Sequence, residues 1–196
     1  MRYAKALLAL GVVIGVALVG AGTVWFARPY IFHGSVIGPP VLASDFSLTD
    51  QNEKPFRLSA QAGQMVLLFF GYTNCPDECP ATMAQFKRIR AELGREAERV
   101  QFVLVTVDPE VDTPGRLGEF VAKFDPTFIG LTGTRAELEP VWKSYGVYQA
   151  KQSSGEVAHN SRIYAIDARG NLRLTYTTDA PAAEIARDVQ QLLRNR

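Results

Sequence analysis

The stretch Met65–Pro80, MVLLFFGYTNCPDECP, decides the fold because an apolar run leads directly into two cysteines. Residues 65–70 form a continuous apolar run of strand length, which predicts a fully buried strand. Cys75 and Cys79 follow this run, and residues 80–93 are predicted to form a helix. The sequence therefore places two thiols where a buried strand gives way to a helix.

Strand and helix signals alternate after this junction. Thr113 before Pro114 and Thr134 before Glu137 have the form of helix caps. Further strands are predicted over residues 101–107, 128–131, 162–167 and 172–177, and helices from Pro114, over 135–145 and from Pro181. The order β-α-β-α-β-α-β-β-α implies a parallel core with a final hairpin that adds an antiparallel edge. We therefore expect an α/β, thioredoxin-like fold with one extra helix and strand inserted.

The N-terminal segment has the features of a membrane anchor. Residues 6–27 contain no charged side chain, and a helix of this length spans a hydrocarbon core of about 30 Å. Arg2 and Lys5 precede the run, which by the positive-inside rule holds the N-terminus in the cytoplasm. A cleaved signal peptide is the alternative, but its apolar core is usually shorter and ends at a small-x-small site.

The expected organisation follows from this anchor. The absence of an Arg- and Ser-rich transit segment favours the bacterial inner membrane, with the globular domain on the periplasmic side. The four predicted parts are a cytoplasmic N-terminus (1–5), a transmembrane anchor (6–27), a linker (28–40) and a globular domain (41–196).

The composition excludes several classes of protein. The 196 residues are 47% hydrophobic and 21% charged, which is typical of one globular domain rather than a disordered chain. A net charge of +1 gives no global signal for nucleic acid, and no nucleic-acid partner is expected. Two cysteines rule out a four-cysteine zinc site.

The position of the two cysteines suits either redox chemistry or metal binding. A thiol at a helix N-terminus feels the positive end of the dipole, which lowers its pKa, and the thiolate is both nucleophile and metal ligand. Redox dithiols usually have two intervening residues, whereas Cys75 and Cys79 have three between them. The longer loop lets both sulfurs converge on one soft ion and still permits a disulfide. Asp77 and Glu78 oppose the dipole and are expected to make thiolates harder to form.

A soft ion needs a third ligand, and the chain has two histidines. His33 lies in the predicted linker, where we expect no role beyond its position near the membrane. His159 precedes the strand predicted from Arg162, and in a thioredoxin-like fold that loop faces the cysteine junction. Thiol oxidoreductases of this fold place a cis-proline there, but this chain has no proline between positions 141 and 180. Two thiolates and one imidazole suit Cu(I), or Cu(II) if a further ligand is added.

The chain resembles the Sco/SenC family of membrane-anchored copper proteins that are needed for cytochrome c oxidase assembly. The resemblance covers the anchor and about Ser44 to the C-terminus. It is carried by the motifs Asp45–Asp50 (DFSLTD), Phe70–Pro80 (FGYTNCPDECP), Val107–Pro114 (VDPEVDTP) and Gly130–Arg135 (GLTGTR), and by His159.

The resemblance implies a site and a partner. Cys75, Cys79 and His159 would be the ligands of Cu(I) or Cu(II), and copper would pass to the CuA centre of oxidase subunit II. Another copper carrier or a thiol reductant would be a further partner. Many members have Asp before the histidine, where this chain has Ala158, and a carboxylate there would orient the imidazole or aid docking.

Other polar residues near the site have a weaker signal. The family resemblance implies that Asp77 recognises the partner or tunes the copper ligands beside it. Asp108, Glu110 and Asp112 form an acidic loop, which fits solvated carboxylates, a hard-metal site, or a role in docking or site support. Met83 follows Cys79 by one helical turn and is expected in the core rather than as a ligand.

Three functions compete at this stage. A copper metallochaperone, which is not an enzyme, accounts for both the thiols and His159. A thiol–disulfide reductase that keeps the CuA cysteines reduced, or a redox or copper sensor, would use the same dithiol. A peroxidase of the peroxiredoxin type needs Thr three residues before its cysteine, and this chain has Tyr72 before Cys75.

Overall fold

The computed structural model describes residue 11 and residues 29–151, 157–159 and 162–194, and for 149–151 and 157–159 it describes the backbone alone. The chain divides into two compact units, Met1–Ile31 and Phe32–Arg196. Within the described ranges, no helix is both long and apolar enough to cross a membrane. The predicted anchor over 6–27 lies outside the described residues apart from Gly11, so it stays a prediction.

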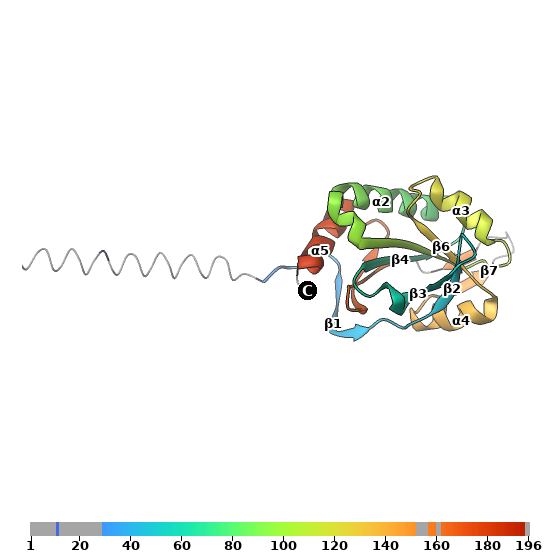
Figure 1. The fold of residues 1–196 in the computed structure, drawn as a ribbon, viewed down its shortest axis with the longest axis horizontal. Helices are drawn as coiled ribbons and strands as arrows, with labels where there is room; N and C mark the ends of the chain where they lie inside the picture. The colour runs from blue at the N-terminus through green and yellow to red at the C-terminus, as the bar shows by residue number, and fades with distance from the viewer. Residues whose placement is uncertain (1–10, 12–28, 152–156, 160–161, 195–196) are drawn as a thin grey trace, which may run out of the picture. The chain divides into compact units, whose positions relative to one another are not determined.

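Phe32–Arg196 is built around one mixed sheet (Figure 1). Its strands are β1 (Ser35–Leu42), β2 (Ser47–Asp50), β3 (Pro55–Arg57), β4 (Met65–Gly71), β5 (Val100–Thr106), β6 (Ile129–Thr132), β9 (Arg162–Ile166) and β10 (Asn171–Thr177). Their order across the sheet is β1-β10-β9-β4-β5-β6-β2-β3. The pairs β4–β5 and β5–β6 are parallel, and all other neighbouring pairs are antiparallel. A separate antiparallel ribbon consists of β7 (Gln149–Lys151) and β8 (Val157–His159).

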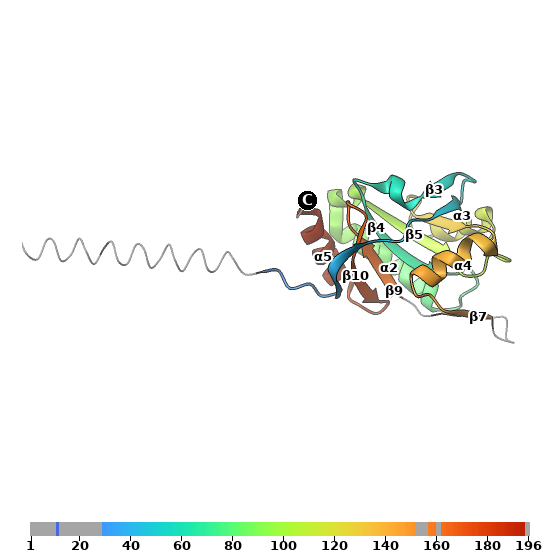
Figure 2. The same ribbon diagram turned by 90° about the horizontal axis from the view of Figure 1, so that it is seen from below.

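Helices cover both faces of the sheet. They are α2 (Glu78–Leu93), α3 (Pro114–Ala122), α4 (Arg135–Ser144) and α5 (Ala182–Arg194), with the 3-10 helices η1 (Leu58–Gln61) and η2 (Gly94–Arg99). α2 packs beside α5 on one face, with α3 on the same side, and α4 covers the opposite face (Figures 1 and 2). The predicted order of elements from Met65 onward is confirmed, with the β7–β8 ribbon added.

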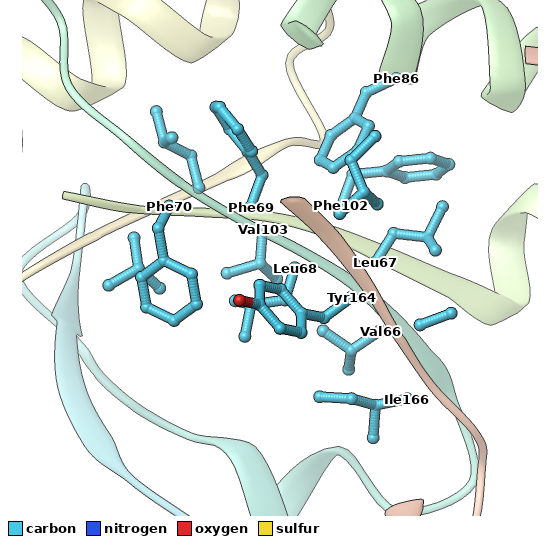
Figure 3. Close-up of a cluster of buried hydrophobic side chains, with 14 of the residues drawn as sticks. Val66, Leu67, Leu68, Phe69, Phe70, Phe86, Phe102, Val103, Tyr164 and Ile166 are labelled. Atoms are coloured by element: carbon cyan, nitrogen blue, oxygen red, sulfur yellow. The ribbon is translucent and has the colours of Figure 1, made fainter. Parts of the chain in front are cut away.

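The apolar run of β4 is buried on both faces, as its composition predicts. Every residue of β4 is buried. Phe69 and Phe86 of α2 lie on one side of the sheet, and Phe70 and Tyr164 lie on the other (Figure 3). The rings of Phe70 and Tyr164 are 5.8 Å apart, and those of Phe86 and Phe102 are 5.5 Å apart. A strand with apolar contacts on both faces has no polar side to alternate with, which explains its unbroken apolar sequence.

Both predicted helix caps are present. The Thr113 hydroxyl accepts a hydrogen bond from the Arg116 amide, and Pro114 is the first residue of α3. Thr134 and Glu137 form a reciprocal capping box at the start of α4. Such caps satisfy amides that have no partner within the helix. They fix the start of α4 and of α3, and the loop before α3 bonds to Thr73 in the loop that carries Cys75.

The predicted linker does not end at residue 40, because β1 occupies Ser35–Leu42 and pairs with β10. The sequence predicted that the final hairpin forms an edge of the sheet. This prediction is wrong, because β1 pairs with β10 and is itself the edge strand. Almost all of β1 is exposed, so it lacks the alternation of buried and exposed residues that marks a strand. The residues at its centre, Gly38-Pro39-Pro40, are typical of a break in a strand, and the pairing register of β1 with β10 shifts between Val36 and Val41.

His33 has a structural role that corrects the sequence expectation. The wholly buried carboxylate of Asp188 on α5 accepts hydrogen bonds from the backbone amides of His33 (2.9 Å) and Gly34 (3.0 Å) and from the Tyr176 hydroxyl (3.1 Å). His33 Nδ1 lies 2.9 Å from the same carboxylate. We call these four residues the Asp188 clasp. It fastens the chain before β1 to α5.

Candidate metal centre

The two cysteines lie at the end of β4, where the sequence placed them. Cys75 is in the loop that follows β4, and Cys79 is in the first turn of α2. Cys75 is half-buried, Cys79 is fully buried, and both are free thiols. The Cys79 amide donates a hydrogen bond to the Cys75 sulfur at 3.3 Å. The structure therefore brings both sulfurs to the N-terminus of one helix, with Cys75 nearer to solvent.

The two thiols have opposite pKa shifts. A hydrogen bond from the Cys79 thiol is the main cause that lowers the pKa of Cys75 to about 5, and amides of Cys79, Asp77 and Glu78 add to it against the effect of burial. The same hydrogen bond and burial raise the pKa of Cys79 above its ordinary value. Near neutral pH the pair therefore consists of one thiolate and one thiol.

This result changes the expectation for the acidic residues between the cysteines. The charge of Glu78 does raise the pKa of Cys79. The amides of Asp77 and Glu78 nevertheless lower the pKa of Cys75, because they donate hydrogen bonds to its sulfur. Glu78 therefore hinders the ionisation of Cys79, whereas the backbone amides of Asp77 and Glu78 favour that of Cys75.

Gly71 gives the Cys79 sulfur its space. A Cβ atom at Gly71 would lie 2.8 Å from Cys79 Sγ and 2.7 Å from a ring carbon of Phe69. Both distances are shorter than a van der Waals contact, so a side chain at this position would displace the sulfur or the ring. The last residue of β4 is a glycine because the buried thiol packs directly against its backbone.

A buried carboxylate fixes the loop that carries Cys75. Asp112 is fully buried and accepts hydrogen bonds from the Thr73 amide (3.1 Å), the Thr73 hydroxyl (2.5 Å) and the Thr106 hydroxyl (2.7 Å). Arg116 of α3 donates to the Thr73 hydroxyl at 2.9 Å and to the Asn74 side chain. The Asp112 side chain, just before α3, thus joins the end of β5 at Thr106 to the loop after β4 at Thr73. Thr73 lies two residues before Cys75.

The other members of the acidic loop also have protein partners. Asp108 is buried, and its amide donates to the Thr106 hydroxyl at 2.9 Å. Glu110 is exposed and forms an ion pair with Arg135 at 2.6 Å. Hydrogen bonds from Arg135 lower the pKa of Glu110 against the effect of burial. In the described part of the chain, no group of three or more His, Cys, Asp or Glu side chains is placed to hold a metal ion.

The two remaining candidates near the cysteines have different surroundings. Asp77 is exposed beside Cys75, so it is available to a partner. Met83 is fully buried within the hydrophobic core, as predicted.

The backbone brings the segment that contains His159 to the cysteine end of the sheet. β9 runs antiparallel to β4 with Ile163 opposite Phe69, so β9 begins where β4 ends. His159 is the last residue of β8, three positions before β9. A span of three residues reaches at most about 10 Å, which keeps this backbone near the end of β4. The side chain of His159 lies outside the described part, so its place as a ligand stays a prediction.

Comparison with known proteins decides the family. The SCO1/SenC family model matches residues 35–194. The chain belongs to the SCO1/SenC family. A relative, a putative copper-binding protein of Stutzerimonas stutzeri, is 34% identical over 153 residues, which are 76% of this chain and 75% of the relative.

Solved SCO1/SenC structures share the fold. Bradyrhizobium japonicum ScoI with copper bound is 33% identical, with a TM-score of 0.70, over 78% of this chain and 99% of that chain. BsSco, a member of the Sco family of cytochrome c oxidase assembly proteins in which a disulfide switch was identified, is 26% identical. Its TM-score is 0.69 over 85% of this chain and 99% of that chain. These likenesses confirm the predicted thioredoxin-like α/β class.

Sequence reasoning missed most of the contacts that support this SCO1/SenC site. Asp112 was assigned to an acidic loop, and its bonds to Thr73 and Thr106 were not foreseen. Arg116 was not singled out at all. The one signal was the position of Asp112 after a buried strand and before a capped helix, where a carboxylate can bond to the neighbouring strand end.

Proposed function

We propose that this chain is a metallochaperone that holds copper between Cys75, Cys79 and His159 and delivers it to the CuA centre of cytochrome c oxidase subunit II. The observation that carries the proposal is the cysteine pair, in which Cys75 is ionised near neutral pH and Cys79 lies beside it in the first turn of α2. Copper in the ScoI relative and the oxidase assembly family of BsSco support it.

Copper is the cargo, and these donors suit it. Thiolates favour Cu(I), and imidazole is a common copper ligand. Cys75 engages the ion first because its thiolate already exists, and Cys79 follows when its proton is released to solvent. His159 then supplies the third donor. An acceptor with its own thiolates takes over the ion by ligand exchange, so that copper never leaves as a free hydrated ion.

The location belongs to the same proposal. Residues 6–27 anchor the chain in the bacterial inner membrane, with the globular domain on the periplasmic side. The support is the uncharged apolar run and the two cations before it. An anchored carrier meets a membrane-bound acceptor by diffusion in two dimensions.

The first test is a Cu(I) titration of the reduced full chain, held in detergent, against a competing chelator. We expect one tightly bound equivalent, a loss of tight binding in Cys75→Ser and Cys79→Ser, and a weaker affinity in His159→Ala. His33→Gln is the matched control because it changes the other histidine and leaves the thiols intact. An affinity that is equal in His159→Ala and the wild type would contradict the three-ligand site.

The second test is transfer. The copper-loaded chain is mixed with a soluble CuA domain whose cysteines are reduced, and the absorption of the assembled CuA centre is followed. A CuA domain loaded with Cu(I) alone would be colourless, so Cu(II) is added to supply the second copper ion of the binuclear centre. No growth of this absorption, despite normal copper binding, would overturn delivery while leaving the copper site in place.

A second candidate function is reduction of a disulfide in the oxidase subunit. The low pKa of Cys75 and the adjacent Cys79 favour it, since the first would attack a disulfide and the second would resolve the mixed disulfide. Two electrons pass to the substrate, the chain is left as a disulfide, and an external thiol reductant restores it. His159→Ala should leave thiol exchange intact and weaken only copper binding, which separates the two functions. A redox or copper sensor would use the same dithiol without transfer.

A further inference from the structure

Exposed apolar side chains gather on the edge strand β1. Val36 is 61% exposed, Val41 49% and Leu42 77%, and all three are among the exposed large hydrophobic side chains of the described residues. The inner edge of β1 pairs with β10, and β1 is the terminal strand in the order of the sheet. In Figure 1 this strand, in light blue, forms a margin of the domain. We call Val36, Val41 and Leu42 the β1 apolar edge.

This edge is uncharged as well as apolar. Residues 29–44 contain no Asp, Glu, Lys or Arg, and His33 in this stretch is held in the Asp188 clasp. Edge strands of soluble proteins usually carry charged side chains, which discourage association. An uncharged edge with exposed apolar groups therefore indicates a surface that contacts something apolar.

Pairing with a second strand does not explain the edge. Pro39 and Pro40 have no amide to donate, and the register of β1 shifts between Val36 and Val41. Prolines and bulges at an edge prevent the regular ladder that strand addition requires. A second copy of this chain, or an extended peptide, would therefore find few donors along the middle of β1.

The position of the edge in the chain indicates its partner. The uncharged apolar run over 6–27 ends eight residues before Ser35, and eight extended residues reach at most about 29 Å. If that run spans a bilayer, β1 is the first element of the domain beyond it. The Asp188 clasp shortens this reach further, because it holds His33 and Gly34 on the domain.

A cation lies at the far end of the edge. Arg169, in the turn before β10, lines a pocket of about 200 Å³ together with Leu42 and Ala43. Asp45 and Asp167 also line this pocket, and they form ion pairs with Arg57 and Arg173. The side chain of Arg169 is exposed and makes no ion pair with any residue that the structure describes. An exposed guanidinium beside apolar side chains matches the boundary between lipid tails and anionic headgroups.

We infer that the β1 apolar edge, with Arg169 at its end, rests on the surface of an anionic phospholipid bilayer. The inference rests on the membrane anchor of the proposed function. The side chains of Val36, Val41 and Leu42 enter the interfacial layer, and Arg169 binds lipid phosphate. The contact orients the domain, so that β3 and β2 at the other edge of the sheet face away from the membrane.

The test measures the depth of defined positions in the full chain, reconstituted in vesicles of phosphatidylcholine and phosphatidylglycerol. The fluorescent amino acid Anap replaces Val36 or Leu42 in separate proteins, and the vesicles contain lipids with a doxyl quencher near the headgroup. The matched control is Anap at Asn52, which is exposed between β2 and β3 at the opposite edge. We expect quencher lipids to remove most of the emission at 36 and 42 and to leave that at 52 unchanged.

Equal quenching at positions 42 and 52 would overturn the inference. Blue-shifted emission at position 42 that lipid quenchers do not reduce would also overturn it, because a protein would then cover the edge. A variant with Val41→Glu and Leu42→Glu should lose the quenching at position 36. Its unchanged Cu(I) affinity would verify folding, and retained quenching would overturn the inference. Arg169→Glu should reduce quenching in vesicles that contain phosphatidylglycerol but not in phosphatidylcholine alone, and no reduction would remove Arg169 from the contact.

An alkaline carbonate wash of the same vesicles separates this inference from the anchor. A chain that resists the wash but shows no preferential quenching at 36 and 42 keeps its anchor and refutes the bilayer contact. A chain that is extracted but shows the quenching refutes the anchor and supports the contact. Extraction without quenching refutes both.

Discussion

Removal of the Asp112 carboxylate is expected to destabilise the domain and loosen the Cys75 loop. In Asp112→Ala the buried Thr106 hydroxyl loses its acceptor, and so do the amide and hydroxyl of the half-buried Thr73. A buried donor without a partner costs about 1–3 kcal/mol, and each bond that water can replace costs about 0.5–1.5 kcal/mol. The free energy of unfolding should therefore fall by about 2–6 kcal/mol.

The isosteric change Asp112→Asn isolates the role of the charge. The amide keeps one oxygen to accept from Thr73, while its NH2 group faces the Thr106 hydroxyl, which can turn to accept. We expect a loss of about 1 kcal/mol, smaller than that of the alanine variant. Glu92→Ala on the exposed side of α2 is the control, and its effect should stay within about 0.5 kcal/mol.

Urea unfolding of the reduced, copper-free fragment 29–196, followed by far-UV circular dichroism, gives these values. Hydrogen exchange of the loop after β4 provides a local readout. Asp112→Ala should speed exchange of the Thr73 amide far more than Asp112→Asn does. An alanine variant within about 1 kcal/mol of wild type, with unchanged exchange at Thr73, would refute the view that this carboxylate holds the loop.

Three further predictions concern the thiols and the clasp. The rate at which iodoacetamide alkylates Cys75 should rise with pH with a midpoint near pH 5, because the pKa of this thiol is lowered to about 5. In Cys79→Ala the midpoint should rise toward pH 9.0, because the main hydrogen bond to the Cys75 sulfur is lost. A wild-type midpoint near pH 9.0 would be inconsistent with the site. Gly71→Ala should lower the free energy of unfolding by about 1–3 kcal/mol and weaken Cu(I) affinity, since its Cβ would press on Cys79 Sγ, and an unchanged chelator titration would disprove this packing. Tyr176→Phe removes one hydrogen bond to the buried Asp188 and should cost about 1–3 kcal/mol in urea unfolding, whereas a neutral result would show that the hydroxyl contributes little.

The centre of the fold was predictable because its signals are local. The apolar run of β4 is buried on both faces, and the caps at Thr113 and Thr134 each use a residue three positions away. The same holds for the cysteine pair, whose contacts lie within one loop and one helical turn. Such features depend on neighbouring residues, and these are visible in a single sequence.

The edges of the sheet and the support of the site were not predictable in this way. β1 is exposed over nearly its whole length, so its apolar residues show no period. His33 and Asp188 are 155 positions apart, and Thr73 and Asp112 are 39 apart. Each of these carboxylates looks like an ordinary polar residue until the fold brings its donors to it.

The Asp188 clasp also determines how force enters the domain. A pull on the chain before Phe32 is taken up at His33 and Gly34, whose amides are bound to α5. The load then spreads into α5 and β10, while β10 and β9 separate β1 from β4. α5 packs against α2, whose first turn carries Cys79, so the load passes from the clasp to the cysteine helix without crossing the sheet. A pull on the chain before β1 is therefore coupled through α5 to the helix that holds the buried thiol.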